Sequence, residues 1–207
     1  MKTRKVLKAI PVISAAICIV LLISVAGCAS TKSDQPFYQW GQLEQQQDST
    51  EKGEPVILAK HFTIYSDELD FLTEELSLTH PENAADIATQ TLIEKYTLFY
   101  QAQKAGLVVS DSDVEAVIRK QIEIFAETPS EEYDEFLAGL GMTNEEYWNS
   151  RKDELIITES IAAWKEQQYD EYARSYEENA DPQEWEDYFD ALKNSIIEKE
   201  HIQYQNQ

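Results

Sequence analysis

The sequence is poor in the residue types that build most catalytic and metal sites. Its 207 residues include two cysteines, three histidines and six glycines. His61, His80 and His201 are too far apart to form a zinc-binding motif. No glycine-rich phosphate loop, GxSxG elbow or Ser-x-x-Lys pattern is present. We therefore predict no catalytic residue, no metal ligand and no cofactor, and we expect that the protein is not an enzyme.

Basic residues are also scarce. The 17 lysines and arginines face 39 aspartates and glutamates, which gives a formal net charge of −22. A chain of this charge repels a phosphate backbone, so nucleic acid is not an expected partner. Acidic pairs such as Glu131-Glu132 and Asp134-Glu135 are expected by chance in so acidic a chain, and exposed pairs are usually solvated charge.

One long stretch without any charge runs from Ala9 to Ala29, after the basic start "MKTRKVLK". This layout is typical of an export signal. Its last residues, "VAGC", resemble the bacterial lipobox, in which a cysteine receives a diacylglyceryl group and the chain is cut before it. We predict a signal peptide over residues 1–27 and a lipid anchor, including a fatty acid such as palmitate, on Cys28. An uncleaved membrane-spanning helix is the alternative.

The lipid anchor would place the protein at the extracytoplasmic face of the cell membrane. After processing, Cys28 would be the sole cysteine, which excludes a disulfide within the chain. Residues 28–54 are rich in Gln, Ser, Thr and charge and show little periodicity, so we predict a flexible tether there.

The remaining residues, 55–207, read as one helical domain. "PVILAKHFTIY" at Pro55–Tyr65 predicts one or two short strands. Capping residues and glycines then predict helices from Ser66, from Pro81 to about Ala105, and from Ser110 and Ser130. Thr143 opens a long helix predicted to run to about Glu178. Pro182 starts the last helix, and His201–Gln205 is a candidate closing strand. The fold class is therefore mainly α, with one long helix and a small terminal β element.

Three segments resemble one family in their order and spacing. They are "VILAKHFTIYSDELDFL", "LIEKYTLFYQAQKAGLVVSDSDVEAVI" and "EFLAGLGMTNEEYWNSRKDEL". Together with the closing "WEDYFDALKNSIIEKEHIQY", they are similar to the N-terminal domain of SurA-type periplasmic chaperones and PrsA-type foldase lipoproteins. Foldases of this type carry a parvulin-like prolyl isomerase domain between the long helix and the closing helix. The few residues at Glu177–Asp181 leave no room for one here, so isomerase activity is not implied.

The resemblance implies a SurA N-terminal-like helical domain that binds unfolded or exported polypeptides without a reaction. Aromatic residues at helical spacing are the candidate contacts, although most aromatics at such spacing belong to a core. The predicted peptide-binding residues are Phe99, Tyr100, Phe125, Tyr133, Phe136 and Trp148. Two alternatives are an adaptor lipoprotein that docks one specific envelope or secretion partner, and an enzyme of an unrecognised kind.

Overall fold

The structure is a computed structural model that describes residues 36–47, 53–175 and 182–205. The predicted signal peptide and Cys28 lie outside these residues. The elements, in chain order, are α1 (Pro36–Gln47), β1 (Pro55–Leu58), β2 (Thr63–Tyr65), α2 (Ser66–Ser77), α3 (Ala84–Ala105), α4 (Asp111–Glu127), α5 (Glu131–Leu140), α6 (Asn144–Ser150), α7 (Lys152–Ser175), α8 (Pro182–Glu198) and β3 (Gln203–Tyr204). The mainly α fold class is confirmed. None of the helices in the described part is long and apolar enough to span a membrane.

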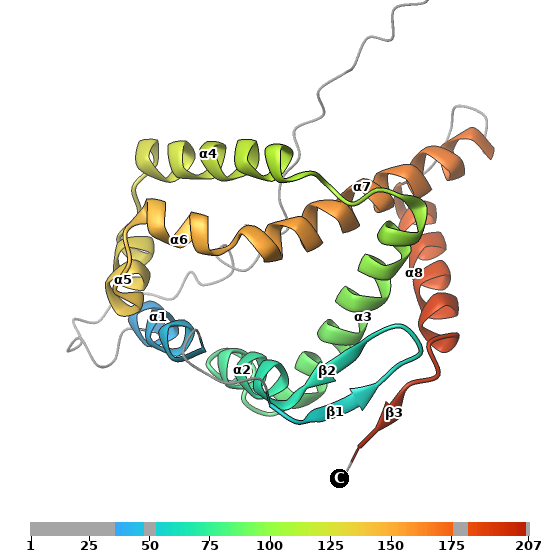
Figure 1. Cartoon of the computed structure of the whole chain (residues 1–207), viewed down its shortest axis with the longest axis horizontal. Coiled ribbons are helices and arrows are strands. Elements are labelled where there is room, and N and C mark those ends of the chain that lie inside the picture. The colour runs from blue at the N-terminus through green and yellow to red at the C-terminus, as the bar shows by residue number, and fades with distance from the viewer. Residues whose placement is uncertain (1–35, 48–52, 176–181, 206–207) are drawn as a thin grey trace, which may run out of the picture.

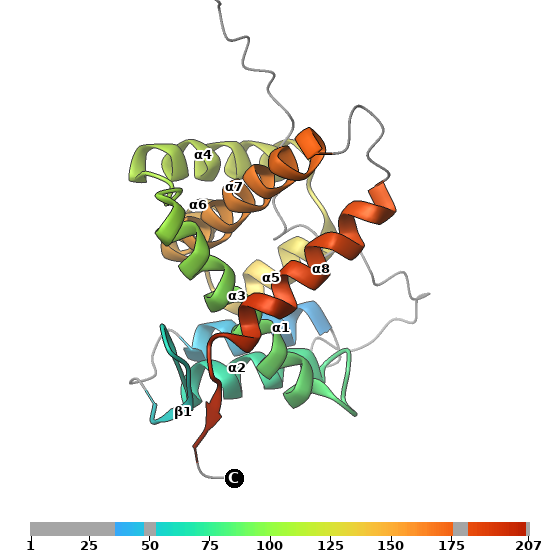
Figure 2. The ribbon, with the colours of Figure 1, turned by 90° about the vertical axis from the view of Figure 1, so that its right-hand side faces the viewer.

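The helices follow the outline of the molecule in Figure 1. The α4, α6 and α7 helices run along the top, α5 and α1 lie at the left, and α3 and α8 lie at the right. The small sheet closes the lower side, next to α2. Figure 2 shows α8 crossing in front of α3, with the chain end leading into β3.

Local signals place most helix ends where the sequence predicts them. The Ser110 side chain accepts a hydrogen bond from the backbone N–H of Asp113, as an N-cap does. Thr143 and Glu146 form a complete capping box at the start of α6. Gly106 and Gly141 end α3 and α5 in the left-handed region, with φ of 72° and 73°, which glycine adopts without strain.

The three strands form one antiparallel sheet in the order β2-β1-β3. Ile57 of β1 pairs with Ile64 of β2 on one side and with Tyr204 of β3 on the other. Ile57 and Ile64 are fully buried and pack on Leu92 and Ile93 of α3. The predicted closing strand is therefore present, and it places the C-terminal end of the described residues beside β1.

Two predictions about long segments were wrong. Residues 36–47 of the expected flexible tether form α1, which packs on α5 and α2. The helix predicted from Thr143 to about Glu178 is divided at Arg151, which separates α6 from α7, and residues 176–181 lie outside the described ranges. Near the break, Asn149 and Ser150 donate side-chain hydrogen bonds to the backbone carbonyls of Glu145 and Tyr147, which favours a local departure from the regular helix.

Candidate functional site

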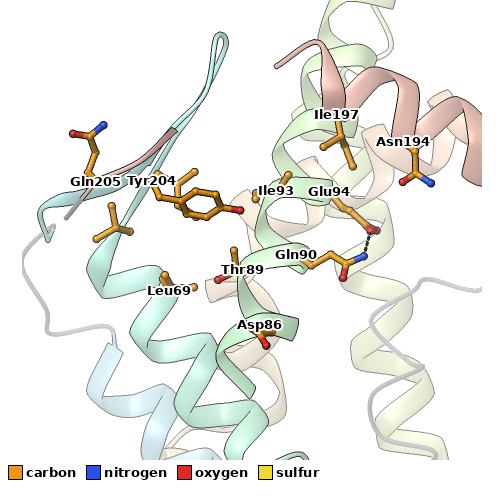
Figure 3. A pocket seen from close by; sticks show the side chains of 12 residues that line it. Leu69, Asp86, Thr89, Gln90, Ile93, Glu94, Asn194, Ile197, Tyr204 and Gln205 are labelled. Atoms are coloured by element: carbon orange, nitrogen blue, oxygen red, sulfur yellow. Dashed lines mark hydrogen bonds between the residues drawn. The ribbon is translucent and has the colours of Figure 1, made fainter. Parts of the chain in front are cut away.

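A pocket of about 590 Å³ lies between the sheet, α2, α3 and α8. Figure 3 shows side chains from these four parts of the fold around one hollow. The segments meet there because β3 returns along β1 after α8. The pocket is thus built from residues that lie far apart in the sequence.

The wall of the pocket toward the core is apolar. It is formed by Val56 and Ile57 of β1, Leu69 of α2, Ile93 of α3 and Ile197 of α8. Ile57 and Ile93 are only 1% and 7% exposed, so this surface is fixed by the packing of the sheet on α3. A fixed apolar surface can bury an apolar side chain of a ligand without first being ordered.

The rim is polar and acidic. Along α3, Gln90 donates a hydrogen bond to Glu94 at 3.0 Å, and Asp86 lies one turn earlier on the exposed side. Lys193 of α8 lies 3.2 Å from Glu94 and the same distance from Asp190. The carboxylates at this rim outnumber the nearby lysine, which favours a ligand that carries basic groups beside its apolar ones.

The edge of the sheet borders the pocket. Tyr204 of β3 is 56% exposed and lines the pocket, and β3 is the outermost strand on this side of the sheet. The backbone N–H of Gln205 donates to the carbonyl of Val56 at 2.8 Å, so the strand pairing continues past Tyr204. A short edge strand next to an apolar pocket suits an extended peptide, which can use both the strand's free backbone groups and the pocket.

The side chains around the pocket are of the kinds that bind a ligand. In the described ranges, no group of three or more His, Cys, Asp or Glu side chains could hold a metal ion. The side chains around the pocket are aliphatic, amide, hydroxyl and carboxylate groups, together with the phenol of Tyr204. Such a lining can hold an apolar side chain and orient it with a few polar contacts.

Four of the six sequence-predicted aromatic residues come together away from the pocket. The ring of Phe125 lies 4.3 Å from that of Tyr133 and 5.5 Å from that of Trp148, and Phe136 lies 6.3 Å from Tyr133, all between ring centroids. Tyr133, Phe136 and Trp148 are only 8%, 8% and 5% exposed. These rings fill the core between α1, α4, α5 and α6, and a peptide would reach them only if one of these helices moved away. Burial also raises the pKa of the Tyr133 phenol to about 12, so it stays protonated.

The other two predicted residues, Phe99 and Tyr100, are half-buried on α3. The ring of Tyr100 stacks on that of His61, with 3.8 Å between centroids. His61 also lies 3.0 Å from the carboxylate of Glu200, which is 2% exposed. This contact fastens the turn between β1 and β2 to the residues just before β3, so it holds the sheet that borders the pocket.

The residues that line the pocket were not predicted from the sequence. Ile93 and Leu69 carry the same helical spacing as core residues, and Tyr204 lies in a strand of two residues. The apolar residues of "PVIL" predict a strand, but they do not alternate with polar residues, so the sequence does not indicate which of them face the pocket. A pocket assembled from five elements leaves no contiguous motif.

Comparisons with known proteins give one match. Residues 53–161 match the sequence profile of a family described as a SurA-like N-terminal domain. Neither a curated protein nor a solved structure matches the chain. The match covers β1 through residues 152–161, the first part of α7, and the six residues between α7 and α8 leave no room for an inserted domain. The chain therefore belongs to the SurA-like N-terminal domain family, whose relation to chaperones agrees with the resemblance predicted from its motifs.

Proposed function

We propose that this protein is a membrane-anchored extracytoplasmic lipoprotein that binds unfolded or exported polypeptides, called clients below, as a chaperone-like module without isomerase activity. The observation that supports the proposal best is the pocket beside the sheet edge. It combines a preformed apolar wall, an acidic rim and a strand edge in one place. The membership in the SurA-like N-terminal domain family also supports binding of polypeptides.

Binding at this pocket would be weak and tolerant of sequence. The apolar wall can bury one or two client side chains, and each buried side chain contributes about 1.5–3 kcal/mol. Backbone hydrogen bonds along β3 do not depend on the client's sequence. The acidic rim would favour segments in which Lys or Arg stands next to an apolar residue. The predicted lipid on Cys28 would hold this binding surface near the membrane, where exported chains emerge, and would raise its local concentration.

A pair of threonines on α3 gives a matched test. Thr89 lines the pocket, whereas Thr91, two residues later, is exposed and lies outside it. The variant Thr89→Phe should fill the pocket, and Thr91→Phe should add the same ring to open surface. We expect the wild-type protein and Thr91→Phe to suppress the aggregation of several unrelated unfolded proteins at near-stoichiometric ratios, and Thr89→Phe to bind them about tenfold more weakly.

The assay uses the protein as its host produces it, reconstituted in lipid nanodiscs, with circular dichroism to verify that each variant is folded. Equal client binding by all three proteins would show that the pocket is not the client site. Failure of the wild type to bind any client, together with capture of one tight partner, would favour the adaptor alternative.

A further inference from the structure

The α1 helix lies outside the residues that match the family, 53–161, and packs along α5. Figure 1 and Figure 2 both show the two helices next to each other, with α2 on the other side of α1. The surface of α5 beneath α1 is called the α5 groove here, and it is lined by Phe136, Gly139 and Leu140. This groove lies at the opposite side of the fold from α8 and is separate from the pocket.

The two helices approach closely through a glycine on each. A Cβ atom on Gly41 would lie 2.1 Å from the carbonyl oxygen of Phe136, and one on Gly139 would lie 2.1 Å from the carbonyl oxygen of Tyr38. Both distances are far below van der Waals contact, so no larger residue fits at either position without separating the helices. The α5 groove thus accepts a segment only where a glycine faces Gly139.

Two aromatic side chains of α1 pack against α5 beside this glycine. Phe37 and Trp40 are packed against the buried cluster of Tyr133, Phe136 and Leu140. The ring of Trp40 meets that of Phe136 edge to face, with centroids 6.2 Å apart. Residues three and four apart share a helix face, so Phe37, Trp40 and Gly41 form one recognition surface. The pattern is an aromatic residue, two others, a second aromatic residue and a glycine.

The α1 helix depends on this contact for its own structure. It has 12 residues, no acidic residue in its first turn and no basic residue in its last turn. Isolated helices of that length are marginal in water, and the interior Gly41 weakens this one further. A helix that forms through docking can also open at a low free-energy cost compared with the core.

The polar contacts of α1 bring two carboxyl groups near each other. Trp40 Nε1 donates a hydrogen bond to Glu75 Oε1 of α2 at 2.5 Å, and Arg151 lies 3.6 Å from Glu44. Burial, together with the negative charge of Glu44, raises the pKa of Glu75 to about 7. Near neutral pH, part of the population carries an ionised Glu75, which is unfavourable when buried beneath α1. The ionisation of Glu75 therefore weakens the docking of α1 on α2.

We propose that the α5 groove is a second polypeptide-binding surface, that α1 is its resident occupant, and that client segments displace α1. The clients it fits present two aromatic side chains three residues apart, with a glycine directly after the second. This inference rests on the proposed function in that clients are polypeptides, but it concerns a different surface. Because α1 is tethered, it competes at an effective concentration on the order of millimolar, so free segments bind weakly until α1 is released.

The test compares two neighbouring positions on α1. Gly41→Val inserts a Cβ into the backbone of α5 and should release α1, whereas Gln42→Val adds the same side chain at an exposed position. The probe is a fluorescent peptide with the sequence of residues 36–47, "PFYQWGQLEQQQ". It is added to each protein in nanodiscs, and fluorescence anisotropy measures binding. Hydrogen exchange over residues 36–47 measures the release of α1.

We expect Gly41→Val to bind the peptide at least tenfold more tightly than the wild type and Gln42→Val do, with faster exchange over residues 36–47 alone. A peptide with valine in place of its glycine should not bind. A second peptide of unrelated sequence that keeps only the two aromatics and the glycine should bind Gly41→Val as the first one does. If Gly41→Val does not fold, Trp40→Ala, which removes one ring contact and the bond to Glu75, should show the same direction of change.

Three results would overturn the inference. The first is a released α1 with no gain in peptide binding. The second is binding by the α1 sequence but not by the unrelated peptide. The third is a wild-type dimer that exchanges α1 between copies, which would assign the groove to a second copy of this chain. Peptide binding by Thr89→Phe, measured in parallel, separates the two surfaces. If no protein suppresses aggregation while Gly41→Val still binds both peptides, the proposed chaperone function fails and the exchange at the α5 groove stands.

Discussion

Replacing Glu75 by Gln should stabilise the protein at alkaline pH and leave it almost unchanged in acid. The Glu75 carboxyl of α2 is partly buried and receives the indole N–H of Trp40. Desolvation is the largest cause that raises its pKa to about 7, and Glu44 adds to it, whereas Trp40 and Arg151 act in the opposite direction. The net result is that the folded state disfavours the ionised form of Glu75.

The size of the effect follows from the pKa difference between the two states. A glutamate in the unfolded chain has its ordinary pKa of 4.5, so between that value and about 7 the folded protein holds a proton that the unfolded chain has lost. Stability therefore falls as the pH rises through this window. The full penalty, on the order of 3 kcal/mol, is reached near pH 8, and it is below about 1 kcal/mol at pH 5. Glutamine keeps the oxygen that accepts from Trp40 and carries no charge.

Urea denaturation at pH 5, 6, 7 and 8 measures the difference between the variant and the wild type. At pH 8, Glu75→Gln should raise the midpoint by about 1–2 M, since a domain of this size loses about 2 kcal/mol per molar urea. The matched control is Glu74→Gln, because Glu74 is the exposed neighbour on the same helix. Equal effects of the two variants at every pH would refute the reasoning. A loss of stability in Glu75→Gln at pH 8 would do so as well, because it would mean that the folded state binds the carboxylate favourably.

Two further changes test polar contacts between residues that lie far apart in the sequence. His61→Ala should destabilise the protein by about 3 kcal/mol in urea denaturation. It leaves the buried carboxylate of Glu200 without the imidazole that lies 3.0 Å away. The control is His80→Ala, which changes an exposed histidine and should have little effect on stability. Ser160→Ala should cost about 1–2 kcal/mol, because the buried Ser160 hydroxyl accepts from the backbone N–H of Val109 at 3.1 Å, and a thermal melt should show the loss.

The sequence predicts the helix boundaries well because their causes are local. A serine or threonine that caps its own helix, as at Ser110 and Thr143, needs only the three residues that follow it. Gly106 and Gly141 likewise end helices through their own backbone freedom. The short strands and the closing strand also follow from composition and brevity. Each of these features could be read before any tertiary contact was known.

The division at Arg151 accompanies side-chain hydrogen bonds from Asn149 and Ser150 to the preceding turn, and because such bonds bend a helix without always breaking it, the sequence does not predict the break. Arg151 also pairs with Glu44 of α1, a residue more than a hundred positions earlier in the chain, and the local sequence does not indicate this partner.

The positions of the aromatic residues depend on tertiary contacts. Helical spacing placed Tyr133 and Phe136 on one face, but it does not say whether that face turns toward a client or toward another helix. In the structure it turns toward α1, α4 and α6.

The α1 helix was missed for a related reason. "PFYQWGQLEQQQ" has an interior glycine and no charged residues that favour its ends, so its local propensity predicts a tether. The helix forms because Gly41 lets it lie directly on Gly139. Its Trp40 also packs against the ring of Phe136 and donates a hydrogen bond to the side chain of Glu75. Structure that is formed by docking in this way is also the structure most easily exchanged for another segment.

The family match ends inside α7, yet the residues after it complete both the core and the pocket. Trp185 and Phe189 of α8 pack with Trp164 and Leu98, which belong to α7 and α3. The pocket takes Ile197 and Tyr204 from the same C-terminal part. Residues 53–161 therefore lack two of the elements that line the pocket, α8 and β3, and α8 also supplies half of the aromatic core beside α3. If clients bind at the pocket as proposed, they would contact both the family-matched residues and the C-terminal helix and strand, and removal of α8 and β3 would remove part of the pocket wall.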